Sequence, residues 1–289
     1  MTIATGRAGG FDRLRSKTVV RLKSSKKSLD EIGHQADFYR KSILEIPIAV
    51  KNYRRETVRL VAEVALGNGA LALIGGTVVI CGFLTLSAGT VVALQGYVSL
   101  GNIGVEALTG FFAAYVNVRI AAPVIAGVGL AATIGAGATA QLGAMRISEE
   151  IDALEVMGVR SVPYLASTRI VAGMIAIIPI YSVAVIASFI ASRTITVVVW
   201  GQSGGVYDHY FASFLNPTDL LWSFLQAILM GLVVMLIHTY FGYNASGGPA
   251  GVGEAVGRAV RASLAAVVFV TLAVSLAVYG VSGNFNFAG

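Results

Sequence analysis

This chain of 289 residues is 56% hydrophobic and only 12% charged, and its formal net charge is +6. Ordinary soluble domains contain about 25% charged residues, so the composition excludes such a domain and indicates a membrane protein. The single cysteine, Cys81, excludes an internal disulfide, and no Cys/His group has the spacing of a metal site.

A basic arm comes first. Residues 1–59 contain 14 basic and 6 acidic side chains. Two apolar stripes at helical spacing predict amphipathic helices lying on anionic lipid headgroups; they consist of Phe11, Leu14, Thr18 and Leu22, and of Ile32, Tyr39, Ile43, Ile46 and Val50. A disordered tail is the alternative for residues 1–28. Basic arms also bind nucleic acid, but beside a membrane span they are typical of lipid anchors, so we expect no nucleic-acid partner.

The rest of the chain reads as a transmembrane domain, residues 61–289, following an arm of residues 1–60. Five long runs contain no charged residue: Val64–Val105, Ile120–Met145, Ile170–Ser192, Leu220–Gly253 and Ala262–Gly289. A spanning helix needs roughly 20 apolar residues. The runs therefore predict an all-α polytopic protein with spans near 70–94, 120–143, 170–192, 220–241 and 263–281.

The second half of the first run is rich in glycine and contains Glu106. This composition over Gly96–Ala114 predicts a re-entrant or broken element after the first span, lining a cavity or packed on protein.

Basic residues predict the orientation. With five spans, 19 of the 21 lysines and arginines fall on one side, leaving Arg119 and Arg193 on the other. The positive-inside rule then predicts a cell-membrane protein with a cytoplasmic N-terminus and an external C-terminus.

A charged segment, Arg146–Gly158, joins the second and third predicted spans. It predicts an amphipathic helix with Ile147, Ile151, Leu154 and Met157 on one face and acidic residues away from it. Such a helix can dock into a groove of a soluble partner; the alternative is a solvated connector. The small residues before it, from Gly127 to Gly143, indicate close helix packing, either static or able to slide.

The sequence from residue 135 to 172, GAGATAQLGAMRISEEIDALEVMGVRSVPYLASTRIVA, resembles the signature of the MlaE/YrbE permeases, the membrane subunits of Mce-type ABC lipid transporters. The resemblance covers roughly residues 60–280. It includes VVALQGY at Val91–Tyr97, Gly104-Val105-Glu106, Arg119 to Pro123, Phe241-Gly242-Tyr243 and the loop Gly251–Arg261. The long basic arm is similar to that of actinobacterial Mce-associated YrbE permeases, which occur as two paralogues per transporter.

The resemblance implies a transporter for lipids, fatty acids or sterols, built with a second YrbE-type permease chain. It implies a cytoplasmic ABC ATPase dimer, which binds ATP and Mg²⁺, and Mce-domain proteins on the outer side. This chain is expected to bind no cofactor and to be no enzyme, because it lacks the Gly-Lys-Ser/Thr of a P-loop and has no lysine after Lys51.

Two sets of site residues follow from this hypothesis. The ATPase-coupling set is Arg146, Glu149, Glu150, Asp152, Leu154 and Glu155. The polar lining of the lipid path is Gln95, Tyr97, Glu106 and Arg119, although Glu106 also fits a loop residue at the outer interface. Family members commonly carry Arg-Glu ahead of Gly-Pro, whereas this chain has Arg119-Ile120-Ala121-Ala122-Pro123 and lacks the acidic neighbour.

Two other functions are the alternatives. An ion-coupled secondary carrier needs paired charges at the membrane midplane, and the charge-free runs offer almost none. An intramembrane serine protease would use Ser203, within Gly201–Gly205, and His238. A nucleophile elbow requires a strand before the serine and a helix after it, and the predicted topology separates the two residues.

Overall fold

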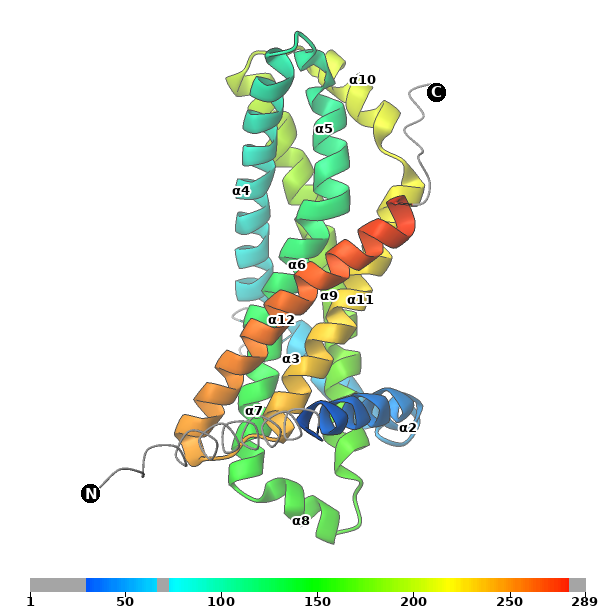
Figure 1. Ribbon diagram of the computed structural model, residues 1–289, viewed down its shortest axis with the longest axis vertical. Helices are drawn as coiled ribbons and strands as arrows, with labels where there is room; N and C mark the ends of the chain where they lie inside the picture. Colours follow the sequence, from blue (N-terminus) through cyan, green and yellow to red (C-terminus); the bar gives the residue numbers. More distant parts are fainter. Residues whose placement is uncertain (1–29, 67–72, 281–289) are drawn as a thin grey trace, which may run out of the picture.

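The structure, a computed structural model, describes residues 30–66 and 73–280. Within these ranges every regular element is helical. Figure 1 shows an elongated bundle with the short helix α8 (Glu150–Val156) at one end and α10 (Gly204–Phe214) at the other. We call these the α8 end and the α10 end.

Five segments among the described residues are long and apolar enough to cross a membrane, which confirms the predicted all-α polytopic fold. They are Thr77–Gly101 in α4 (Leu73–Gly101), Glu106–Ile147, Val162–Val199, Pro217–Tyr243 (α11) and Gly248–Val278 in α12 (Gly248–Tyr279). The helix of residues 30–44 lies toward the α8 end, and α12 ends toward the α10 end (Figure 1), as an odd number of spans requires.

The second and third spans are composite helices. The second joins η1 (Glu106–Leu108), α5 (Thr109–Val116), η2 (Asn117–Ala121), α6 (Ala122–Leu130), η3 (Ala131–Gly135) and α7 (Ala136–Ile147). The third joins η4 (Val162–Ser167), α9 (Thr168–Thr194) and η5 (Ile195–Val199). The segments η2 to η5 are π-helical turns.

The predicted re-entrant element is absent from this described region. Helix α4 continues unbroken to Gly101, a tight turn with Gly104 at φ +73° follows, and the second span begins at Glu106. Gly96 and Gly110 allow close packing and do not break a helix. A Cβ at Gly96 would lie 2.6 Å from the Phe112 ring, and one at Gly110 would meet the Tyr207 carbonyl.

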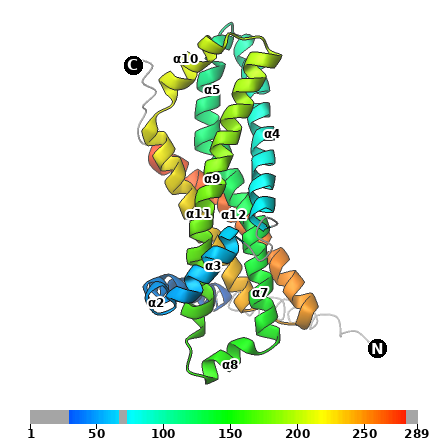
Figure 2. The ribbon, with the colours of Figure 1, turned by 180° about the vertical axis from the view of Figure 1, so that it is seen from behind.

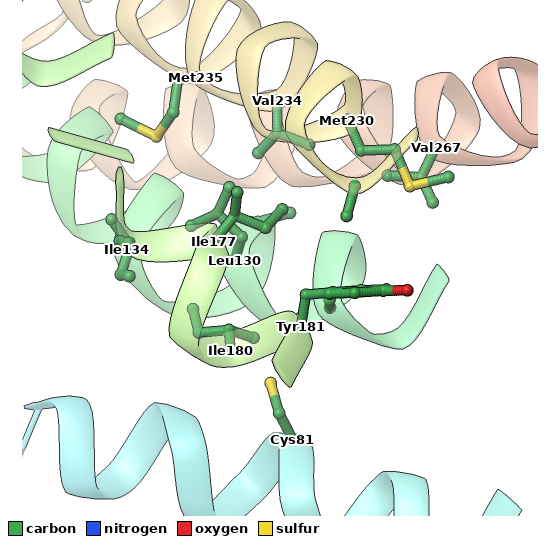
Figure 3. Close-up of a cluster of buried hydrophobic side chains, with 14 of the residues drawn as sticks. Cys81, Leu130, Ile134, Ile177, Ile180, Tyr181, Met230, Val234, Met235 and Val267 are labelled. Carbon is green, nitrogen blue, oxygen red and sulfur yellow. The ribbon is translucent and has the colours of Figure 1, made fainter. Parts of the chain in front are cut away.

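One apolar core joins all five spans (Figure 3). Leu130 and Ile134 come from the second span, Ile177, Ile180 and Tyr181 from the third, Met230, Val234 and Met235 from the fourth, Val267 from the fifth and Cys81 from the first. Cys81 is fully buried, as expected of a small core residue. Helices in membranes associate through such packing, because lipid tails are themselves apolar.

The row of small residues packs within this chain. A Cβ at Gly127 would crowd Met230 and Val267, one at Gly129 would meet the Cys81 sulfur, and one at Gly135 would lie 2.6 Å from the His238 ring. These glycines therefore allow the second span to approach the first, fourth and fifth closely, and they do not leave a small-residue surface for another chain.

Three short helices lie across the bundle at the α8 end (Figure 2): residues 30–44, α2 (Ile46–Asn52) and α3 (Arg54–Leu66). Tyr39 and Ile46 of the predicted stripe pack against the core, whereas Ile32, Ile43 and Val50 are exposed. The boundary drawn at residue 60 falls inside α3 and stays a prediction. The stripe of Phe11 to Leu22, residues 67–72 and the C-terminal segment from residue 281 lie outside the described residues.

Candidate coupling site and lipid path

The charged segment between the second and third spans forms the α8 end (Figure 1). The helix is shorter than the predicted Arg146–Gly158, because α7 ends at Ile147 and α8 begins at Glu150. Glu149 separates them at φ 61°, a left-handed conformation that is uncommon for residues other than glycine. Gly158, at φ +79°, follows the end of α8, in the role that its residue type predicts.

The apolar face of α8 packs onto the bundle through two residues. Ile151 is fully buried against Leu142 and Leu165, and Leu154 packs on the same cluster. Ile147 and Met157, predicted on that face, are exposed. The break at Glu149 changes the helical phase, so Ile147 follows the geometry of α7.

Two of the predicted coupling carboxylates, Asp152 and Glu155, connect α8 to neighbouring helices of the chain. The Asp152 carboxylate accepts a hydrogen bond of 2.7 Å from the Arg146 guanidinium. This ion pair bridges the break between α7 and α8. Glu155 Oε1 accepts hydrogen bonds from Ser161 Oγ at 2.5 Å and from the Tyr243 hydroxyl at 3.2 Å. These bonds hold α8 against the start of the third span and the end of the fourth.

The remaining surface of α8 combines acidic and apolar side chains. Glu149 and Glu150 are exposed, and the Glu150 carboxylate accepts a bond from Ser148. Val156 is 89% exposed and Met157 is 69% exposed. Large apolar side chains that project outward from a charged helix are typical of a surface that binds another protein.

The predicted lipid-path residues do not form one cluster. Tyr97 stacks on Trp200 with ring centroids 4.7 Å apart, and this contact joins the first span to the end of the third span on the α10 side. Glu106 is exposed at the start of η1, and its backbone carbonyl accepts a bond from Gln202. Gln95 is exposed and bonds to Ser99 on its own helix.

Arg119 lies apart from the other three. It follows Glu106 by thirteen residues, about 20 Å along a helix, and sits in the π-helical turn η2. Its guanidinium makes a 2.7 Å ion pair with Asp219 at the start of α11 and lies 4.1 Å from the centroid of the Tyr115 ring. Asp219 therefore supplies an acidic partner from another span, in place of the missing sequence neighbour.

Polar side chains around η2 connect four spans. Asn117 donates to Ser192 Oγ at 2.8 Å, and Ser192 donates to the Gly89 carbonyl at 3.0 Å. Ser223 donates to the Val118 carbonyl at 2.5 Å. Wide helical turns leave backbone groups available for such bonds and often occur at functional sites.

Helix α10 is clamped to the end of the third span. Asp208 accepts two bonds of 2.8 Å from Arg193, and these hold the pKa of its carboxyl below the usual 3.8. Tyr207 is buried, and its burial raises the pKa of its hydroxyl. The α10 end is thus an ordered cap on the bundle.

Ser203 and His238 are far apart. Ser203 is exposed at the N-terminal end of α10, whereas His238 lies five residues before the opposite end of α11 and is fully buried. His238 Nδ1 lies 2.7 Å from Thr139 Oγ1. The pairing required for a protease is therefore absent, and His238 serves helix packing.

Sequence reasoning missed three functional candidates. Asp219, Trp200 and Ser161 each pair with a predicted site residue, 100, 103 and 6 positions away from it in the chain. Asp219 offered a signal, since it stands at the very edge of a charge-free run.

Comparisons with known proteins agree on one family. A family model described as Permease MlaE matches residues 67–277. The chain is 29% identical over 177 residues to the intermembrane phospholipid transport system permease protein MlaE of Haemophilus influenzae, covering 61% of this chain and 67% of that protein. It is 30% identical over 185 residues to a probable ABC transporter permease protein of Rickettsia felis, covering 61% and 68%. It is 25% identical over 188 residues to the protein TRIGALACTOSYLDIACYLGLYCEROL 1, chloroplastic, of Arabidopsis thaliana, covering 65% and 54%.

Proposed function

This chain belongs to the MlaE permease family, and we propose that it is a membrane subunit of an Mce-type ABC transporter that moves lipids, fatty acids or sterols across the cell envelope. The observation that carries the proposal is the acidic helix α8, held at one end of a five-span bundle whose sequence the family model matches. ATP and Mg²⁺ bind in a separate ATPase, and this chain acts as a transport subunit without catalysis of its own.

The ATPase contact is the exposed surface of α8. Glu149 and Glu150 attract basic groups of a partner, while Val156 and Met157 fill an apolar groove. Ile151 of α8 is buried against Leu142 of α7 and Leu165 of the third span. A force applied to α8 therefore acts directly on α7 and the third span. ATP-driven closure of two ATPase subunits would then rock these spans.

The α8 end is cytoplasmic in this proposal. Arg146, Arg169, Arg258 and Arg261 lie in the parts of the spans nearest that end, Arg160 lies just before the third span, and α2 and α3 add further basic residues. Arg119 and Arg193 lie in the half of the bundle nearer the α10 end. This asymmetry supports the positive-inside orientation, in which the α10 end meets the Mce-domain proteins. The short helices of the arm lie on the anionic inner leaflet, with Ile32, Ile43 and Val50 toward the lipid.

A second permease chain completes the membrane part. The first and fifth spans are the least buried of the five, and they carry large exposed side chains such as Phe83, Val91, Phe269 and Leu276. A cavity between two chains, opening toward the α10 end, would hold acyl tails against these residues. Tyr97, Glu106, Gln95 and Arg119 are the proposed polar groups near its mouth.

Charge reversal at Glu149 and Glu150 tests the proposal. Both carboxylates lie outside the bridges to Arg146, Ser161 and Tyr243, so Glu149→Lys/Glu150→Lys removes the docking charge with little effect on the bundle. The double variant should insert normally yet retain little ATPase on purification. Glu106→Lys, an exposed reversal at the opposite end, should retain the ATPase fully. Wild-type ATPase binding and transport in the double variant would contradict the assignment.

The same purification separates the rival functions. A carrier requires paired charges at midplane, whereas the Arg119–Asp219 pair lies at the first turn of α11. Co-purification of an ATPase and Mce-domain proteins is the expected result. Transport or proteolysis by the isolated chain would favour a carrier or a protease instead.

A further inference from the structure

One tyrosine connects three separate elements at the α8 end. Tyr243 is the last residue of α11. Its hydroxyl lies 2.7 Å from Ser161 Oγ and 3.2 Å from Glu155 Oε1, so its single hydrogen is directed at these two acceptors. Ser161, only 3% exposed, donates to the same carboxylate oxygen at 2.5 Å. The three oxygens therefore form a closed triangle between α8, the start of the third span and the end of the fourth.

The ring of Tyr243 extends the same network. Its centroid lies 5.4 Å from that of Phe38, in the helix of residues 30–44. Tyr240, one turn earlier on α11, contacts Phe38 with centroids 5.6 Å apart. The Arg146 guanidinium lies 5.9 Å from the Tyr243 centroid. Tyr243 thus touches the arm with its ring while its hydroxyl reaches α8.

We propose that Tyr243 is a positioning residue that transmits displacement of α8 to the fourth span and to the helix of residues 30–44. The inference rests on the proposed function, in which an ATPase moves α8. Backbone connects α8 directly to the second and third spans only, so movement reaches α11 through side chains. Hydrogen bonds to a carboxylate are roughly twice as strong as hydrogen bonds between neutral groups. Glu155 therefore holds α8 firmly to Ser161 and Tyr243.

The test removes the hydroxyl and keeps the ring. Tyr243→Phe removes the hydroxyl that contacts both Ser161 and Glu155, whereas Tyr240→Phe removes a hydroxyl from the same helix without touching Glu155. The complete transporter is reconstituted in liposomes, and ATPase retention, ATP hydrolysis and lipid moved per ATP are measured. Tyr243→Phe should retain the ATPase and hydrolyse ATP but move about tenfold less lipid per ATP. Tyr240→Phe should stay within about twofold of wild type.

Two further measurements separate positioning from a general loss of stability. Ser161→Ala should reproduce the loss, and adding it to Tyr243→Phe should cause little further decrease, because both act through one triangle. Spin labels on exposed Val156 and Asn244, in a Cys81→Ala background, should give a narrow distance distribution that broadens in Tyr243→Phe.

Each outcome bears on one claim. Wild-type lipid per ATP in Tyr243→Phe, or an equal loss in Tyr240→Phe, would overturn the positioning role and leave ATPase docking intact. Release of the ATPase by Tyr243→Phe alone would also overturn it, because Tyr243 would then belong to the docking surface. Failure of the wild-type chain to retain any ATPase would instead overturn the proposed function.

Discussion

Alanine at Gly135 would disturb a close contact between the second and fourth spans. A Cβ at this position would lie 2.6 Å from His238 Cδ2, 2.8 Å from Nε2 and 2.9 Å from Cγ. The ring cannot easily rotate away, because its Nδ1 lies 2.7 Å from Thr139 Oγ1 and the residue is fully buried. The new methyl group must therefore push two packed helices apart.

The cost follows from the distances. Ordinary van der Waals contact begins near 3.4 Å, so the ring or the helix must move by about 0.8 Å. Overpacking of this kind costs roughly 1–3 kcal/mol, while replacing a helical glycine with alanine gains roughly 0.5–1 kcal/mol. We expect Gly135→Ala to lower the free energy of unfolding by about 1–2 kcal/mol and Tm by roughly 2–6 °C.

Gly137→Ala is the matched control. It lies on the same helix, and no described heavy atom comes within 4 Å of its Cβ, so its Tm should stay level or rise. Thermal unfolding in detergent, followed by fluorescence-detected size exclusion, measures both variants. Adding His238→Ala to Gly135→Ala should cost less than it does in the wild type, since the clash is gone. The reasoning is refuted if Gly135→Ala melts at or above Gly137→Ala.

Two other predictions concern topology and the Arg119–Asp219 pair. With Cys81 replaced by alanine, a cysteine at Ser203 should label from outside and one at Ser246 only from inside; labelling of both from one side would contradict the orientation. Removing either partner of the ion pair, by Arg119→Ala or Asp219→Ala, should destabilise the protein by roughly 1–3 kcal/mol, because it leaves the other charge mostly buried. The exchange Arg119→Asp/Asp219→Arg should recover part of the loss, and unchanged Tm values in the single variants would show that the pair contributes nothing.

The fold class, the number of spans and the presence of a charged connector all follow from the amino-acid sequence. A long charge-free run has few structural solutions, because backbone polar groups in lipid must bond within a helix. The same reasoning identified Arg146–Gly158 as the connector between the second and third spans. Its motif also predicted the permease family, which the match over residues 67–277 confirms.

Glycine-rich composition is ambiguous, because a glycine can either break a helix or let another helix pack closely against it. The glycines of Gly96–Ala114 suggested a broken element, yet Gly96 and Gly110 permit close approach of α4, α5 and α10. The small residues from Gly127 to Gly143 indicated close helix packing without identifying the neighbour, and Gly127, Gly129, Gly135 and Gly143 pack against residues of this chain. A glycine in a helix can indicate that a neighbouring segment packs closely against the backbone, but only the fold shows which segment that is.

Tertiary structure alone decided which distant residues meet. Asp219 pairs with Arg119 across 100 residues, and Tyr243 reaches Glu155 across 88. Helical periodicity places a side chain on a face of its own helix, but the crossing of α11 over the second and third spans determines what that face touches. Periodicity also assumes an unbroken helix, so the left-handed Glu149 could not be read from the pattern. Its conformation ends α7 and turns α8 so that Ile151 packs into the bundle while Val156 and Met157 remain exposed.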